Sequence, residues 1–322
     1  MKKVTVRFAA IALTVFMLVQ QAHATHLLIP VGQVVGLEIQ EERVTVAGFD
    51  PALGEAARSA GLQEGDQIAE IDGKPIRCTE DVRQALTVSD GDVELSIVRE
   101  KSVHRLQMQP AITQDGPKLG VFLRQGITGV GTVTYYDPDS GAFGALGHGV
   151  NDKNGELVTM VSGAAYSANV DTIKKGKSGD PGQLMGSVTN PVPIAALSKN
   201  TLQGVFGIAD LPFSGDALPT AAVSEIETGP AMIRSTIENG SVQEYSVEIL
   251  KIYPSSGADG RNLLLRVTDE TLLASTGGIV QGMSGSPIIQ NGKLVGAVTH
   301  VLVNDPTRGY GIFIENMLDA AA

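Results

Sequence analysis

TGGIVQGMSGSPIIQNG (residues 276–292) combines a glycine-rich turn around one serine with a strong hairpin signal. Glycines on both sides of Ser284 leave room for another chain to approach its hydroxyl group, and they free the backbone of the turn. The dipeptide Asn291-Gly292 then separates two apolar runs, residues 287–290 and 293–298. An Asn-Gly pair between apolar runs predicts a tight β-hairpin. This part of the chain should therefore be a serine-bearing turn that leads into paired strands.

Working outward from this turn, strand–turn–strand patterns with glycine at most turns continue over residues 113–322. Examples are the apolar run 131–136, the turn 137–141 and the run 142–146. Many short strands at close spacing predict a β-barrel or a pair of barrels. We therefore expect a mainly β domain over residues 113–322.

Residues 25–112 have a different pattern, because short apolar runs alternate with helical stretches at 52–60 and 79–86. The segment AGLQEGDQIAEIDG (60–73) resembles a PDZ domain, an α+β fold in which a Gly-bearing turn lies on each side of a buried strand. PDZ domains bind an extended peptide as an added strand. We predict that Val35, Gly36 and Leu37 carry the loop that holds the peptide; the alternative is that Gly36 is a turn residue in a domain with only a packing role.

Residues 1–24 have the features of an export signal. Lys2, Lys3 and Arg7 form a basic start, residues 8–19 an apolar run, and Ala22-His23-Ala24 a small-x-small cleavage site. The apolar run is shorter than the ~20 residues of a comfortable spanning helix. We expect a protein that works outside the cytoplasmic membrane, either released or tethered by this segment.

Charge and cysteine content exclude several classes of protein. The 322 residues include 24 Lys and Arg against 35 Asp and Glu, a net charge of -11. Phosphate contacts need clustered basic residues, so no nucleic-acid partner is expected. A single cysteine, Cys78, rules out an internal disulfide. No His-Glu-x-x-His motif is present, and we expect no metal or other cofactor.

A serine nucleophile needs a neighbouring base, and His148 is the favoured candidate. It follows an apolar run and lies between Gly147 and Gly149, which leave its ring accessible. It also precedes Ser284 in the chain, the order base then nucleophile. The other histidines are His23 in the signal, His26 at the new terminus, His104 in the PDZ region and His300, for which a core or cleft-lining role is expected.

The hexapeptide GMSGSP (282–287) is similar to the nucleophile turn of trypsin-like peptidases. In that pattern the N–H groups of Gly282 and Ser284 form the oxyanion hole, which stabilises the negative charge that develops in the transition state. The alternative interpretation is a Gly/Ser turn without chemistry.

Longer segments resemble one family of these peptidases. FGALGH (143–148), VTD (267–269), residues 276–292, GAVTH (296–300) and VNDP (303–306) resemble the stage IV sporulation protein B (SpoIVB) serine peptidases. The resemblance implies an N-terminal PDZ domain followed by a trypsin-like double β-barrel. It also implies His148 as base, Ser284 as nucleophile and Asp269 as the acidic partner.

The acid is the least determined member of this set. Asp171 and Asp210 also lie between His148 and Ser284 and fit by sequence order. Asp269 could instead cap a helix that starts near Glu270, since Asp is favoured at that position.

The resemblance further implies an exported serine endopeptidase that acts in the space between forespore and mother cell. Its substrate there would be a membrane-bound regulator, whose cleavage releases an intramembrane metallopeptidase that processes a late sporulation sigma factor. Self-cleavage near the N-terminus is also implied, although residues 25–33 offer a short stretch for it. Two alternatives stay open: a general extracytoplasmic quality-control PDZ protease, and a non-catalytic PDZ-plus-barrel binding module.

Overall fold

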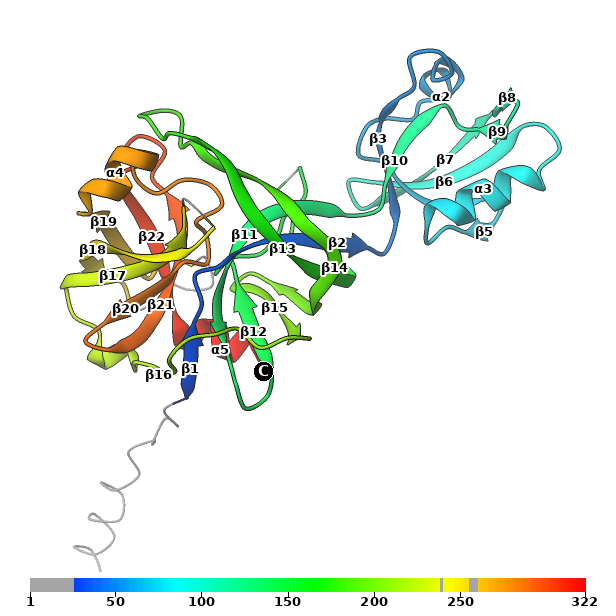
Figure 1. Cartoon of the computed structure of the whole chain (residues 1–322). Coiled ribbons are helices and arrows are strands. Elements are labelled where there is room, and N and C mark those ends of the chain that lie inside the picture. The colour runs from blue at the N-terminus through cyan, green and yellow to red at the C-terminus, as the bar shows by residue number, and fades with distance from the viewer. Residues whose placement is uncertain (1–25, 154, 238–239, 255–259) are drawn as a thin grey trace, which may run out of the picture.

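The computed structural model describes residues 26–322, except 154, 238–239 and 255–259. The predicted export signal, residues 1–24, lies outside the described residues. Two adjoining barrels form one body, and a smaller domain is joined to it by two strands (Figure 1). No helix in the described part of the chain is long and apolar enough to cross a membrane.

The second barrel contains the Asn-Gly hairpin that follows the Ser284 turn. Six strands close in the order β17 (Gly229–Thr236), β18 (Val242–Ile252), β19 (Leu263–Val267), β22 (Arg308–Phe313), β21 (Lys293–Val301) and β20 (Pro287–Gln290). Asn291 and Gly292 join β20 to β21 with φ of 51° and 73°, as an Asn-Gly hairpin requires. Inward-facing residues such as Ile233, Ile249 and Val298 are fully buried and form the barrel core.

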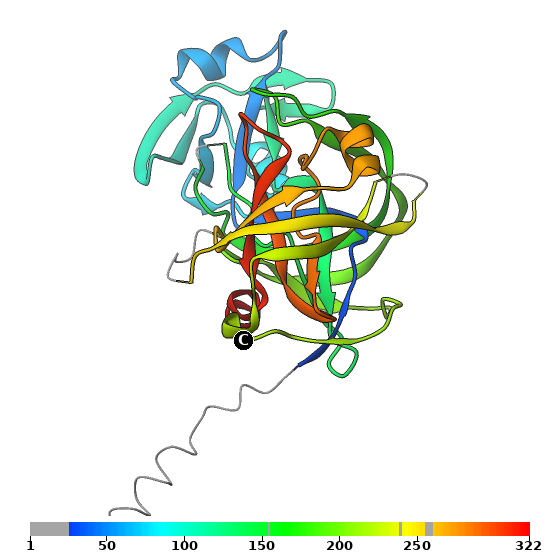
Figure 2. The same ribbon diagram turned by 90° about the vertical axis from the view of Figure 1, so that its left-hand side faces the viewer.

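The first barrel is also closed by six strands. Their order is β12 (Ala142–Ala145), β15 (Gly204–Ala209), β14 (Gln183–Thr201), β13 (Met160–Lys174), β2 (Val34–Glu41) and β11 (Ile127–Tyr136), and β11 pairs back to β12. Two short strands, β1 (Leu27–Pro30) and β16 (Leu218–Pro219), extend the sheet beside β11. The short 3-10 helix η1 (Val223–Glu225) and helix α4 (Glu270–Thr276) are outside the sheets. The C-terminal helix α5 (Ile314–Ala321) packs against β15 of this barrel and β21 and β22 of the other (Figure 2).

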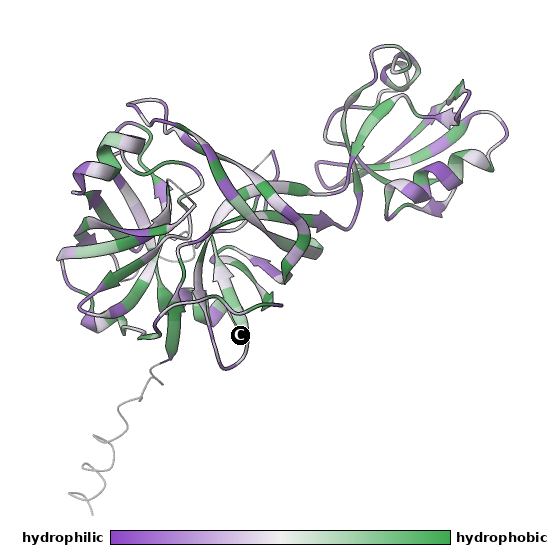
Figure 3. Ribbon diagram, viewed as in Figure 1, coloured by the Kyte–Doolittle hydropathy of each residue, from purple (hydrophilic) through white to green (hydrophobic). Residues whose placement is uncertain are grey.

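The smaller domain is the predicted PDZ fold. It contains β3 (Val44–Phe49), α2 (Glu55–Ser59), β4 (Gln67–Ile71), β5 (Lys74–Pro75), α3 (Thr79–Thr87), β6 (Val93–Arg99), β7 (Ser102–Met108), β8 (Ala111–Thr113), β9 (Gly116–Lys118) and β10 (Val121–Arg124). Its sheet has the order β10-β3-β4-β6-β7 around a core that includes Ile68, Leu95 and Ile97. Hydrophobic residues are found mainly on the strands, whereas α3 is largely hydrophilic (Figure 3). The predicted mainly β fold, a PDZ domain with a trypsin-like pair of barrels, is confirmed.

The predicted domain boundaries need correction, because the PDZ domain is inserted into the first barrel and does not simply precede it. Strands β1 and β2 fall within the predicted PDZ segment 25–112 but belong to the first barrel, while β10 belongs to the PDZ sheet. The insert therefore covers about residues 44–124. Alternation of apolar residues predicts that a strand forms but does not predict which strand pairs with it. The partners of β2 are β11 and β13 of the first barrel. Two antiparallel strand pairs cross the junction, with Thr45 opposite Arg124 and Ile39 opposite Ile127.

Candidate active site

Ser284 lies in a tight turn that presses against the first barrel. Gly282 and Gly285 on either side of it both have φ of +97°, a region that favours glycine. A Cβ on Gly285 would lie 2.0 Å from the carbonyl oxygen of Thr132, so no larger residue fits there. The Thr132 N–H donates to the Ser284 carbonyl oxygen over 3.0 Å, which fixes the turn against β11.

Two backbone N–H groups of this turn have no acceptor among the residues that the structure describes. Met283, Gly285 and Ser286 donate their N–H groups to the carbonyl oxygens of Val280, Val298 and Met283. In the part of the chain that the structure describes, no acceptor takes the N–H of Gly282 or of Ser284. Unpaired donors beside a nucleophile have the arrangement of an oxyanion hole. These are the two donors that the sequence motif indicates.

His148 reaches the same region from the end of β12. Leu146 and Gly147, the two residues before it, have φ of +70° and +69°, which turns the chain sharply. A Cβ on Gly147 would lie 2.9 Å from Cγ2 of Thr299 in the second barrel, so the turn packs tightly there. Leu146 is a non-glycine residue in the left-handed region, which costs about 1–2 kcal/mol and is typical of functional sites.

A backbone carbonyl sets the protonation of the His148 ring. The Nδ1 atom lies 2.8 Å from the Gly149 carbonyl oxygen. Because a carbonyl oxygen only accepts, Nδ1 carries the proton and Nε2 is left free to act as a base. Burial lowers the pKa of His148 below its usual 6.5, and the Gly149 hydrogen bond opposes this in part. The ring is therefore in its neutral, proton-accepting form at neutral pH.

The two residues meet in a cleft of about 770 Å³ between the barrels, lined by Ser284 and His148 together with Thr299 and His300. The Ser284 hydroxyl donates to the Thr299 carbonyl oxygen over 2.7 Å. The imidazole rings of His148 and His300 lie with centroids 5.3 Å apart and planes inclined by 38°. The cleft thus contains a serine hydroxyl group, a histidine whose neutral form is favoured, and two N–H groups that have no acceptor among the described residues.

Comparison with known proteins agrees with this geometry. The sequence model of the SpoIVB peptidase S55 family matches residues 115–318, and that of the PDZ domain matches residues 29–98. The chain belongs to the SpoIVB peptidase S55 family. The predicted family is thereby confirmed.

Individual relatives of this SpoIVB-family chain are distant. It is 28% identical over 218 residues to the Rhizobium meliloti protein R01501, and 33% identical over 87 residues to the Bartonella henselae protein BH06270, both named as zinc metalloproteases. The matches cover 66% and 27% of this chain, but only 53% and 24% of those proteins, so the chain spans about half the length of the first relative. Within the described residues, no group of three or more His, Cys, Asp or Glu is placed to hold a metal ion.

Solved structures with some similarity include two bacterial proteins. One is the active form of the Rv3671c protease from M. tuberculosis, with 16% identity, coverage of 62% of this chain and 75% of that one, and a TM-score of 0.37. The other is the PDZ domain of an SdrC-like protein from Listeria monocytogenes, with 20% identity, coverage of 26% and 87%, and a TM-score of 0.22.

In this SpoIVB-family structure, Asp269 does not take the predicted place beside His148. It is the N-cap of α4, where Oδ1 accepts from the Leu272 N–H over 2.9 Å and Oδ2 from the Ser246 N–H over 3.3 Å. Neither Asp269 nor the exposed Asp171 and Asp210 lines the cleft as far as the structure describes it, and no described carboxylate bonds to His148. The capping role, the alternative left open by the sequence, is the one observed.

The predicted peptide-binding loop also needs correction. Val35, Gly36 and Leu37 lie in the middle of β2, paired with β11 on one side and β13 on the other. Their backbone groups hold the barrel together, and Val35 and Leu37 are buried in its core.

One edge strand of the PDZ sheet is β10, which pairs only with β3 among the described strands, and the other edge strand is β7. Gly120, with φ of +74°, precedes it, and Phe122 is 54% exposed. The apolar-Gly-apolar pattern of Val35-Gly36-Leu37 recurs at Leu119-Gly120-Val121, and the second copy was missed.

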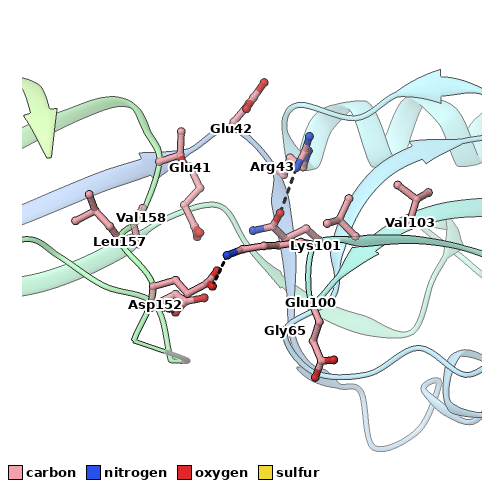
Figure 4. Close-up of a pocket in the computed structure, with 14 residues that line it drawn as sticks. Glu41, Glu42, Arg43, Gly65, Glu100, Lys101, Val103, Asp152, Leu157 and Val158 are labelled. Carbon is pink, nitrogen blue, oxygen red and sulfur yellow. Dashed lines mark hydrogen bonds and ion pairs between the residues drawn. The ribbon is translucent and has the colours of Figure 1, made fainter. Parts of the chain in front are cut away.

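A second cavity, of about 800 Å³, lies at the junction of the PDZ domain and the first barrel (Figure 4). Its charged lining residues are Glu41, Glu42, Arg43, Glu100, Lys101, Asp152 and Glu156. Lys101 of the PDZ domain forms a 2.8 Å ion pair with Glu156, and Lys153 donates to the Glu64 carbonyl oxygen over 2.7 Å. Both contacts tie the loop that follows His148 to the inserted domain. Because this cavity contains no nucleophile–base pair, the chemistry is assigned to the Ser284 cleft.

Proposed function

We propose that this chain is a serine endopeptidase in which Ser284 attacks the scissile carbonyl and His148 is the base. One observation carries the proposal: the two side chains share a cleft with the unpaired N–H groups of Gly282 and Ser284. The serine turn, the histidine or the pair of unpaired N–H groups alone would not distinguish a peptidase from a glycine-rich turn without chemistry; their presence in one cleft does.

The reaction begins when the Ser284 hydroxyl turns from the Thr299 carbonyl to Nε2 of His148. Nε2 takes the proton while Oγ bonds to the carbonyl carbon, and the carbonyl electron pair moves to its oxygen. The N–H groups of Gly282 and Ser284 stabilise that oxyanion. The imidazolium then gives its proton to the leaving amine as the C–N bond breaks. Water, activated by His148 in the same way, hydrolyses the acyl-enzyme and regenerates Ser284.

The cleft lining supports an apolar substrate segment. In the described part of the chain, His148 and His300 are the only ionisable side chains that line it. Its apolar lining includes Leu37, Leu184, Met185, Ile279, Val280 and Val301. A charged side chain entering such a site would lose its hydration without gaining a partner. We therefore infer a preference for uncharged, apolar residues next to the cleaved bond.

The finer proposal is that the substrate is a membrane-bound regulator, cleaved outside the cytoplasmic membrane in the space between forespore and mother cell. Family membership and the export-signal pattern of residues 1–24 support it. The free β10 edge supports a role for the PDZ domain in holding a peptide, either of the substrate or of the chain itself.

An alkyl fluorophosphonate tests the proposal without a known substrate, because it reacts with an activated serine. Mass spectrometry should locate the label on the peptide that contains Ser284. Ser284→Ala should abolish labelling, and His148→Ala should slow it by several orders of magnitude while both proteins stay folded. A folded wild-type protein that is not labelled would favour the binding-module alternative.

A second experiment separates the two protease alternatives. The purified protein is incubated with unfolded casein and with the extracellular segments of candidate membrane regulators, and the cuts are mapped by mass spectrometry. A regulatory protease should leave one or two defined cuts in its substrate. Degradation of casein to short peptides would favour quality control.

A further inference from the structure

We propose that His300 is a positioning residue for the catalytic base and holds the His148 ring through a tilted ring–ring contact. The proposal rests on the proposed function, since it concerns the same Ser284–His148 pair. His148 follows β12 of the first barrel, whereas His300 lies on β21 of the second. Their 5.3 Å ring contact therefore bridges the cleft between the barrels.

Within the described residues, one hydrogen bond orients the His148 ring, from Nδ1 to the carbonyl oxygen of the next residue, Gly149. That bond sets which nitrogen carries the proton. An acceptor so close in sequence moves with the histidine, however, and does little to hold the ring at a fixed distance from Ser284. In other serine peptidases a carboxylate from elsewhere in the fold supplies that restraint, and Asp269 is occupied as a helix cap.

The backbone of His300 is held by strand pairing, so its ring can restrain the His148 ring. It is paired with Tyr310 in the ladder between β21 and β22. The residue before it, Thr299, accepts the Ser284 hydroxyl through its carbonyl and donates its own hydroxyl to the Gly260 carbonyl oxygen over 2.7 Å. The His300 ring thus starts from the strand segment that also contacts the nucleophile. Strand β21 therefore places the His300 ring at a fixed position relative to Ser284. The ring contact then places the His148 ring relative to His300.

Ring pairs with centroids 4.5–7 Å apart attract one another in tilted or offset arrangements. The attraction is modest, but its effect on rate is larger, because a misplacement of about 1 Å in a reacting group can cost about 100-fold. The contact that the structure shows between His148 and His300 is a contact between rings, and a phenyl ring can supply such a contact without nitrogens. Phenylalanine should therefore replace His300, whereas alanine should not.

The test compares His300→Ala, His300→Phe and His300→Leu in the full chain, with the exposed His104→Ala as the control. The probe is an alkyl fluorophosphonate, for which the maximal labelling rate and the half-saturating concentration are measured separately. We expect His300→Ala and His300→Leu to label about 10- to 100-fold more slowly, with the half-saturating concentration within about threefold. His300→Phe and His104→Ala should stay within about threefold of wild type in both values.

Three results would overturn the proposal. If His300→Phe is as slow as His300→Ala, the nitrogens matter and His300 acts by proton transfer. If the loss appears only in the half-saturating concentration, His300 is a binding residue. If His300→Ala matches wild type, the contact has no role. Equal melting temperatures exclude misfolding, and His300→Leu keeps the volume filled if the alanine variant unfolds.

A readout without catalysis separates this proposal from the proposed function. The His148 ring protons lie near the His300 ring, so their NMR shifts should move in His300→Ala and stay close to wild type in His300→Phe. If the wild type is not labelled but these shifts behave as expected, the proteolytic function fails while the ring contact stands. Unchanged shifts in His300→Ala would overturn the contact itself.

Discussion

Asp269 holds the backbone N–H groups of Leu272 and Ser246 with its two carboxylate oxygens. We expect Asp269→Asn to keep nearly full activity, because asparagine caps a helix about as well as aspartate. Asp269→Ala should lower the free energy of unfolding by about 1 kcal/mol, with little change in turnover per folded molecule. Denaturant titration and fluorophosphonate labelling of the two variants check this. A loss on the order of 10⁴ in Asp269→Asn would instead restore its assignment as the catalytic acid.

The pH dependence of activity depends on His148 at the residue scale. The base acts only when neutral, so activity should fall as pH drops through its pKa. Burial lowers that pKa below 6.5, and the acidic limb of the profile should therefore have its midpoint below 6.5. His300 is the other ionisable side chain in the described cleft lining, so the profile of His300→Phe shows how far it contributes. A midpoint clearly above 6.5 would contradict the assignment.

Residue types in their local pattern indicated Ser284, His148 and Gly282, and the structure brings these three residues together in one cleft; their catalytic roles stay a prediction. The sequence indicates these positions because a left-handed or closely packed backbone requires glycine, as at Gly147, Gly282 and Gly285, and these glycines can be read directly from the sequence. No comparable residue pattern in the sequence indicates the roles of Asp269 and His300. Both depend on which residue lies opposite in the folded barrels, and the left-handed Leu146 gives no sequence signal either.

At the scale of elements, β2 belongs to the first barrel and β10 to the PDZ sheet, the reverse of the domains predicted for residues 34–41 and 121–124. Gly36 is paired on both sides within the barrel, so Gly36→Ala should leave peptide capture by the PDZ domain unchanged. Gly120→Ala should weaken it, because the new Cβ at φ +74° would lie 2.2 Å from the Leu53 carbonyl oxygen and displace the start of β10. Fluorescence anisotropy with labelled peptides that end in a free carboxylate measures both variants. Weaker capture in Gly36→Ala alone would return the binding edge to β2.

The strands and their hairpins could be predicted from alternation and from turn dipeptides such as Asn291-Gly292. The pairing of the strands could not be predicted from the sequence. An alternating apolar run can pair equally well in the PDZ sheet or in the first barrel, because the alternation does not specify the partner strand. Residues 34–41 illustrate this limit: the sequence predicts a loop that enters a strand of the PDZ domain there, whereas the structure pairs these residues as β2 within the first barrel.

At the scale of the whole molecule, Glu41 lies buried where β2 leaves the barrel, and Nη1 of Arg124 is 3.8 Å from its Oε2. Burial raises the pKa of Glu41 above its usual 4.5, an effect that Arg124 opposes. The folded state therefore binds this proton more tightly than the unfolded state, and stability from this group falls as pH rises above 4.5. Glu41→Gln should unfold at a higher temperature than wild type at pH 7 to 8, with the difference vanishing below pH 4.5. The exposed neighbour Glu42→Gln serves as the control, and an equal gain in it would contradict the assignment.

The insertion between β2 and β11 has a consequence for how the chain folds. Strand β2 leaves the ribosome early but must wait for residues 42–126 before its partner β11 exists. Closing so long a flexible loop is costly in entropy, by about 0.6 kcal/mol for each doubling of its length. Folding of the insert reduces this entropy cost, because the pairing of β3 with β10 places the two ends of the insert side by side, with Thr45 opposite Arg124. The inserted PDZ domain would thus also help the first barrel to form during synthesis, by holding β2 and β11 close together.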